Sequence, residues 1–104
     1  HLGRLARAFD RLARSDRTYL LRLDLTRKPK KLPTGASVRE VGVAGIFVIS
    51  ATGQRKEILR MLRAVKALKN LGLVRCLIRD SKNSLYLCLL ADGRIITDRE
   101  ENSA

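Results

Sequence analysis

The stretch from Gly53 to Thr97 constrains the fold of this chain more than any other segment. It opens with apolar residues at steps of three and four, which share one face of a helix: Ile58, Met61, Leu62, Val65 and Leu68. The basic residues of the same pattern fall on the opposite face: Lys56, Arg60 and Arg63. Gly72 follows where a left-handed C-cap is needed, so the pattern predicts a helix over 55–71.

Two apolar runs around a polar turn come next, and they predict a β-hairpin over 74–90. A second turn leads to a short third strand over 95–97. One cysteine lies in each hairpin strand, and with a three-residue loop Cys76 and Cys88 would face each other. We interpret each as a small buried apolar residue rather than as half of a disulfide.

The segment before the long helix predicts one more helix and two strands. Residues 2–15 are amphipathic, and their basic side is either phosphate-facing or solvated; it consists of Arg4, Arg7, Arg11 and Arg14. Residues 18–25 alternate between apolar and polar, which is typical of a half-buried strand. Residues 45–50 are apolar and rich in β-branched side chains, which indicates a buried strand.

An exposed basic loop is predicted over 27–36, where Pro and Gly interrupt a run of cations. We interpret it as an arm that lies along phosphates through Arg27, Lys28, Lys30 and Lys31. After it, Ser37 and Glu40 have the spacing of a capping box and predict a short helical turn at 38–41.

The junction before the long helix, residues 51–53, reads as a turn in which Thr52 caps the helix. The small hydroxyl residues there, Ser50 and Thr52, could instead receive a phosphate at the helix amino terminus. At the other end of the chain, residues 98–104 are polar and acidic and predict a frayed tail.

Charge limits the classes of function that fit this sequence. The 104 residues include 22 Lys and Arg against 10 acids, a net charge of +12. A compact domain with this charge is best neutralised by a polyanion, with nucleic acid preferred over an anionic membrane surface. No run of apolar residues is long enough for a membrane span.

Scattered acids and the lack of an internal His argue against an enzyme, a cofactor or a metal site. We therefore predict one α/β (α+β) domain over 1–104 that binds nucleic acid. Its expected element order is helix, strand, loop, strand, long helix, hairpin and short strand.

Several of these pieces resemble the small-ribosomal-subunit protein eight family, in a rearranged or divergent form. The amino-half elements that are similar are helix 2–15, strand 18–25, the basic helix ending in Gly72-Leu73-Val74, and hairpin 74–90. The carboxyl-half motifs that are similar are Lys28-Pro29-Lys30-Lys31, Gly45 to Gly53, and Gly93 to Glu100. In that family the second group follows the first, whereas here the two are interleaved.

This resemblance implies a structural ribosomal RNA-binding protein without catalytic activity. Its partners would be ribosomal RNA and neighbouring ribosomal proteins. Its location would be intracellular, on a ribosome that could be mitochondrial. Ser50 and Thr52 would hydrogen-bond RNA sugar or phosphate, and the basic loop would follow the backbone.

A second resemblance, to winged-helix DNA-binding domains, rests on residues 68–74 and 85–93. It implies a transcriptional regulator that binds duplex DNA as a homodimer, with helix 55–71 as recognition helix and hairpin 74–90 as wing. Lys56, Arg60 and Arg63 would then enter the major groove. A third alternative is an interaction module whose leucine-rich hairpin pairs with another chain. The residues favoured for nucleic-acid contact are Arg27, Lys28, Lys30, Lys31, Ser50, Thr52, Lys56, Arg60 and Arg63.

Overall fold

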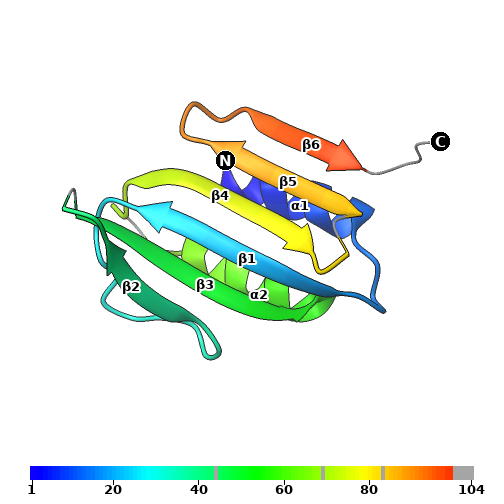
Figure 1. Cartoon of the computed structure of the whole chain (residues 1–104), viewed down its shortest axis with the longest axis horizontal. Coiled ribbons are helices and arrows are strands. Elements are labelled where there is room, and N and C mark those ends of the chain that lie inside the picture. Colours follow the sequence, from blue (N-terminus) through cyan, green and yellow to red (C-terminus); the bar gives the residue numbers. More distant parts are fainter. Residues whose placement is uncertain (44, 69, 83, 100–104) are drawn as a thin grey trace.

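The chain forms one antiparallel sheet with two helices on one of its faces (Figure 1). The computed structural model describes residues 1–43, 45–68, 70–82 and 84–99. Its elements are α1 (Leu2–Leu12), β1 (Thr18–Leu25), β2 (Ser37–Val41), β3 (Ile46–Gln54), α2 (Arg55–Lys66), β4 (Leu73–Asp80), β5 (Leu85–Leu90) and β6 (Ile95–Arg99). The strands lie in the order β2-β3-β1-β4-β5-β6. The predicted α+β fold class is therefore confirmed.

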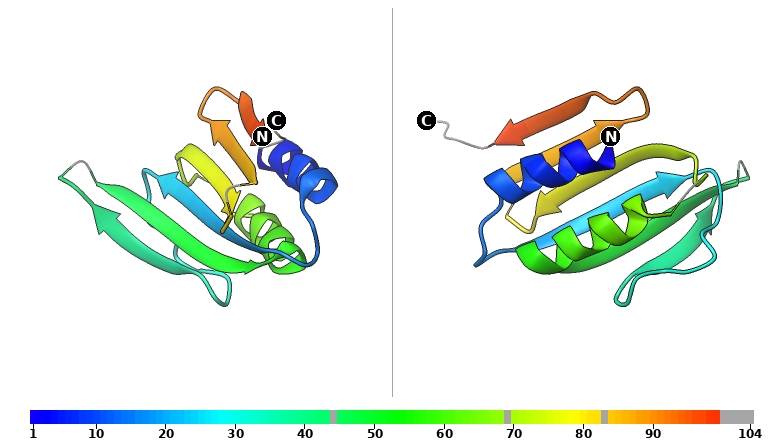
Figure 2. Two further views of the ribbon diagram at one scale, coloured as in Figure 1. Left: turned by 45° about the vertical axis from the view of Figure 1, so that its right-hand side comes forward. Right: turned by 180° about the vertical axis from the view of Figure 1, so that it is seen from behind.

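Both helices bury an apolar stripe against the sheet, as their sequence periodicity predicts. Helix α1 buries Leu5 and Phe9. Helix α2 buries Ile58, Leu59, Met61, Leu62 and Val65. The two helices lie side by side and antiparallel over the same sheet face, as the view from behind shows (Figure 2). The chain is thus a two-layer structure with its core between helices and sheet.

Alternation along the strands fills that core from the sheet side. On β1, Leu21 and Leu23 point to the helices and are at most 2% exposed. Tyr19 of the same strand meets Phe9 of α1 edge to face, with the ring centroids 5.0 Å apart. Helix α1 is therefore fixed to the centre of the sheet by an aromatic pair as well as by aliphatic packing.

The predicted helical turn at 38–41 is wrong, because Ser37–Val41 forms strand β2. It pairs with β3 over its whole length, with Ser37 opposite Ser50 and Val41 opposite Ile46. The spacing of Ser37 and Glu40 fits a capping box, but pairing with β3, which is remote in sequence, outweighs that weak local signal.

The predicted turn at 51–53 is also wrong, since β3 continues to Gln54 and pairs with the full length of β1. Thr52 is consequently a strand residue and does not cap the helix. Residue Gln54 occupies the N-cap position of α2, and its backbone N–H donates to the Glu57 carboxylate at 2.8 Å. A carboxylate in the first turn also complements the positive end of the helix dipole.

Helix α2 is shorter than the sequence predicts and ends at Lys66 rather than at residue 71. Gly72 has the expected positive φ of 64°, but it lies in the connection to β4 and does not cap the helix. Its carbonyl accepts a hydrogen bond from the Thr26 backbone N–H at 2.9 Å, and the Leu71 carbonyl accepts one from Arg27 at 3.1 Å. The segment after α2 thus ties down the start of the basic loop.

The predicted hairpin is confirmed as β4 and β5, but the expected facing of its two cysteines is wrong. Cys76 pairs with Leu89 on the helix-covered side, whereas Cys88 pairs with Leu77 on the opposite side. The connection between the strands has four residues instead of three, so the register is shifted by one. Both thiols are free and buried, as the interpretation of small apolar residues requires.

The last strand, β6, extends to Arg99, so residues 98 and 99 do not belong to a frayed tail. The rest of the predicted tail, 100–104, lies outside the described residues.

Candidate nucleic-acid interface

The basic side of α2 faces solvent, as its sequence pattern predicts. Lys56, Arg60 and Arg63 are exposed. Leu59 and Leu62, which lie between them in the sequence, are buried. The aliphatic residues bind the helix to the sheet, and the cations are left on the outside. This arrangement places three positive charges along one helix without using them for packing.

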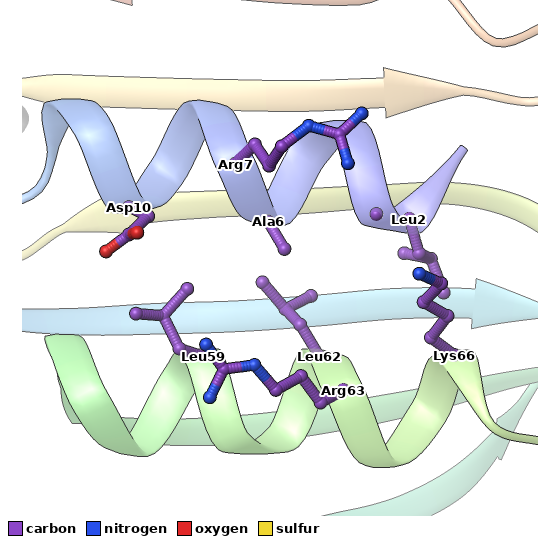
Figure 3. A pocket seen from close by; sticks show the side chains of 9 residues that line it. Leu2, Ala6, Arg7, Asp10, Leu59, Leu62, Arg63 and Lys66 are labelled. Atoms are coloured by element: carbon purple, nitrogen blue, oxygen red, sulfur yellow. The ribbon is translucent and has the colours of Figure 1, made fainter.

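A groove between α1 and α2 continues this basic surface (Figure 3). Its volume is about 190 Å³, and its floor consists of Leu2, Ala6, Leu59 and Leu62. Three cations stand at its rim: Arg7, Arg63 and Lys66. The small size of Gly3 lets Lys66 lie across α1, since a Cβ there would stand 3.0 Å from the Lys66 Nζ. The opposite end of the groove is neutral, because Asp10 pairs with Arg55.

The basic loop lies against the carboxyl end of α2. Pro29 is buried and anchors the loop, while its basic residues are exposed: Arg27, Lys28, Lys30 and Lys31. With Leu68, Asn70 and Leu71 they line a hollow of about 480 Å³. The structure therefore brings the loop cations next to the segment that follows α2.

The returning part of the loop, residues 33–35, runs beside the middle of α2. There a hollow of about 440 Å³ is lined by the loop and by Thr52, Glu57, Arg60, Met61 and Ala64. Arg60 thus borders the loop, whereas Arg63 borders α1. We use the name helix–loop surface for the nine exposed cations gathered by these elements: Arg7, Arg27, Lys28, Lys30, Lys31, Lys56, Arg60, Arg63 and Lys66.

None of these nine cations forms an ion pair with any residue in the described ranges. Six other arginines do: Arg14, Arg17, Arg22, Arg55, Arg75 and Arg94. The positive charge of the helix–loop surface is thus left uncompensated by described acidic side chains, whereas these six arginines each have one. Such a surface attracts an extended anion with many charges.

The predicted contact residues do not all lie on this surface. Ser50 is on the opposite face of the sheet, where β3 pairs it with Arg22 on one side and Ser37 on the other. Thr52 lines the hollow beside Arg60. Successive side chains of a strand point to opposite faces, and Ile49 and Ala51 on either side of Ser50 point to the core. Alternation alone could therefore have placed Ser50 on the face away from the core.

Sequence reasoning did not include Arg7 and Lys66 among the contact residues. Arg7 belongs to the Arg stripe of α1, and Lys66 follows Arg63 by three residues on the outer side of α2. Periodicity could have found both, but it could not show that α1 and α2 lie side by side and share a groove.

Three other kinds of feature would indicate other functions for the described residues: a metal site, a reactive thiol and a membrane-spanning helix. They contain no group of three or more His, Cys, Asp or Glu placed to hold a metal ion. Burial raises the pKa of the Cys76 thiol, so this cysteine stays protonated at neutral pH. No helix in the described ranges is long and apolar enough to cross a membrane.

Comparisons with protein-family models, with curated proteins and with solved structures find no match to this chain.

Proposed function

We propose that this protein binds RNA through its phosphate backbone, as a structural component of a ribonucleoprotein. The observation that carries the proposal is the helix–loop surface, where nine exposed cations gather without a described acidic partner. Contacts between such cations and phosphates release counterions, which gives strong attraction without reading the base sequence.

The shape of the surface favours RNA over duplex DNA. Helix α2 has α1 along one side of it and the basic loop along the other. The DNA major groove is about 12 Å wide and admits a single helix. The A-form RNA minor groove is wide and shallow, so a broad surface made by two helices and a loop fits it better.

The segment before α2 gives a second argument against a recognition helix. A winged-helix domain has a short helix and tight turn there, whereas this chain has β3, which is paired between β2 and β1. The winged-helix alternative would therefore need a recognition helix that follows a strand instead of a short helix and a tight turn. We keep duplex DNA as the comparison ligand in the experiment below.

The partner class follows from the resemblance to the ribosomal protein eight family. We propose ribosomal RNA of the small subunit, cytoplasmic or mitochondrial, and neighbouring ribosomal proteins. The protein then acts without chemistry of its own: it neutralises phosphates and holds folded RNA in place.

Fluorescence anisotropy with an RNA duplex and a DNA duplex of equal length and sequence tests this function. The variant Arg60→Ala/Arg63→Ala removes two cations of the helix–loop surface, and we expect it to weaken RNA binding about tenfold. The matched control is Arg14→Ala/Arg94→Ala, which removes two exposed arginines that already pair with Asp16 and Asp92. It has the same change in net charge and should weaken binding by no more than about twofold.

Equal losses in the two variants would show that total charge alone determines binding and would contradict the proposed surface. Tighter binding to the DNA duplex than to the RNA duplex would favour the winged-helix alternative.

A further inference from the structure

The sheet face opposite the helices carries no covering element among the described residues (Figures 1 and 2). Strand pairing orders its side chains in rows. One row contains Ser37, Ser50, Arg22, Leu77, Cys88 and Ile96. The next row towards β2's carboxyl end contains Arg39, Val48, Asp24 and Arg75. Uncovered faces of antiparallel sheets are normally polar. Val48 and Cys88 are buried, but Leu77 and Ile96 stay accessible, so these two apolar side chains need an explanation.

A buried carboxylate lies at the centre of this face. Asp24 is only 5% exposed, because two arginine side chains fold over it. The Arg22 Nε donates to Oδ1 at 2.8 Å, and the Arg75 Nε donates to Oδ2 at 2.9 Å. Burial alone would raise the pKa of Asp24, but these two guanidiniums lower it below its ordinary value. Asp24 is therefore ionised at neutral pH and holds both arginines.

The geometry of the two arginines leaves donors free. Each uses its Nε edge for Asp24, and no described residue accepts a hydrogen bond from either Nη of Arg75. The side chains of Arg22 and Arg75 remain 40% and 47% exposed. Two guanidiniums that share one carboxylate keep a net positive charge. Their orientation is fixed before any ligand arrives, which favours directional hydrogen bonds to an oxyanion.

Hydroxyl groups and one more arginine surround this pair. Ser50 is the cross-strand neighbour of Arg22, and Ser37 is the neighbour of Ser50. Arg39 lies beyond Val48 in the row of Asp24. The arrangement offers positive charge and hydroxyl donors together, which suits phosphate and ribose oxygens.

Apolar and aromatic side chains continue the face towards β6. Leu77 lies between Arg22 and Cys88, and Tyr86 lies one row further along β5. At the end of the Leu77 row, Ile96 is 46% exposed. Among the described residues, it is one of three large apolar side chains that are exposed. An apolar and aromatic platform of this kind accepts the faces of unpaired bases, which stack on aromatic and guanidinium planes.

We propose that this uncovered face is a second RNA site, which binds a single-stranded segment. A backbone phosphate lies on Arg22 and Arg75 beside Ser50, and the adjoining bases lie on Leu77 and Tyr86. The proposal rests on the proposed function, since it assumes an RNA partner, but it assigns a different face and a different RNA conformation. Base-paired RNA hides its bases, so the platform is specific for single strands.

The charge of the face argues against a second copy of the chain as its occupant. Facing copies would bring Arg22, Arg39 and Arg75 against the same residues, and like charges oppose each other across an interface. An acidic protein segment would be attracted to the same arginines, so the experiment includes it as an alternative.

A labelled uridine decamer and an RNA duplex of about 16 base pairs separate the two faces. The variant Arg22→Gln/Asp24→Asn/Arg75→Gln removes the pair together with its acid, so that no buried charge is left unpaired. We expect about tenfold weaker decamer binding and duplex binding within about twofold of the original protein. The matched control Arg60→Gln changes the net charge by the same one unit and should weaken duplex binding more than decamer binding.

A second variant, Tyr86→Leu, keeps an apolar side chain but removes the aromatic plane. We expect about fivefold weaker decamer binding. Because it leaves the charged cluster intact, it still tests the site if circular dichroism shows that the triple variant does not fold.

Several results would overturn the inference. The first is decamer binding that both sheet-face variants leave unchanged. The second is an equal loss for both RNAs in the triple variant, which would indicate a single binding surface. The third is displacement of the decamer by a peptide of alternating Glu and Leu that binds this face more tightly, which would assign the face to a protein partner. Binding of the duplex without the decamer refutes this inference alone, whereas binding of neither RNA refutes the proposed function as well.

Discussion

The two sides of the sheet carry arginine in two different ways. On the helix–loop surface, nine exposed cations lack a described ion-pair partner, whereas on the uncovered face Arg22 and Arg75 share the buried Asp24. Unpaired cations on flexible side chains attract phosphate from many directions and depend strongly on salt. Guanidiniums fixed by a buried carboxylate present their donors in one direction. The proposed RNA-backbone affinity therefore belongs to one side of the sheet, and the proposed local recognition belongs to the other.

The largest effect should come from detaching the helix layer. Phe9 is fully buried, and its ring centroid lies 5.0 Å from that of Tyr19. Phe9→Ala should therefore lower the free energy of unfolding by about 3–5 kcal/mol. Phe47→Ala is the control, since this side chain is only partly buried, and it should cost about 1–2 kcal/mol. Urea denaturation measures both. Equal costs would show that α1 does not depend on the aromatic pair.

The attachment of the basic loop gives the next effect. Gly72 and Gly45 both have positive φ, of 64° and 72°. A Cβ at Gly72 would overlap Thr26 Oγ1, whereas a Cβ at Gly45 meets nothing within 4 Å. Gly45→Ala should cost about 1–2 kcal/mol for the backbone conformation alone. Gly72→Ala should exceed that by at least about 1 kcal/mol. Similar costs in thermal unfolding would place Thr26 away from Gly72.

On the uncovered face, Asp24→Ala removes the shared acceptor of two charged hydrogen bonds. We expect a loss of about 1–3 kcal/mol in the free energy of unfolding. Asp16→Ala breaks the pair with Arg14, whose side chains are both about two-thirds exposed, and should change stability by no more than about 0.5 kcal/mol. A loss no larger than that of Asp16→Ala would mean that Asp24 does not hold the arginines.

The smallest effect concerns pH. Burial raises the pKa of Asp24 and of Asp80, but hydrogen bonds from Arg22 and Arg75 to the first and from Ser84 to the second lower both below the ordinary value. A carboxyl with a lowered folded-state pKa stabilises the fold above its unfolded pKa of about 3.9 and loses that contribution as pH falls through the folded value. Between about pH 6 and pH 3, the original protein should therefore lose more stability than Asp24→Asn. Identical losses, measured by urea denaturation at both pH values, would contradict the assignment.

Local patterns were sufficient for most of the elements but not for their pairing. Alternation located β1 over residues 18–25, and periodicity located both helices, because these signals lie within one segment. Strand β2 was missed since Ser37 and Glu40 imitate a capping box, and only pairing with β3 reveals the strand. The facing of Cys76 and Cys88 depends on a single residue of loop length, which sequence patterns do not fix.

The candidate site shows the same division. Exposure of Lys56, Arg60 and Arg63 follows from the helix pattern, and exposure of the loop follows from its composition. Their proximity depends on the bonds that tie Thr26 and Arg27 to the segment after α2, which no local pattern contains. The pair of Arg22 and Arg75 was missed for the same reason, since the two residues meet only through the pairing of β1 with β4.

We propose that loop and helix contact one RNA backbone together, and the salt dependence of duplex RNA binding measures that shared contact. The slope of log K against log salt is measured for the original protein, for Lys30→Gln/Lys31→Gln, for Arg60→Gln/Arg63→Gln and for the combined variant. We predict that each double variant reduces the slope by about one to two and that the combined variant reduces it by the sum. An unchanged slope in the loop variant, with a reduced slope in the helix variant, would contradict a shared surface.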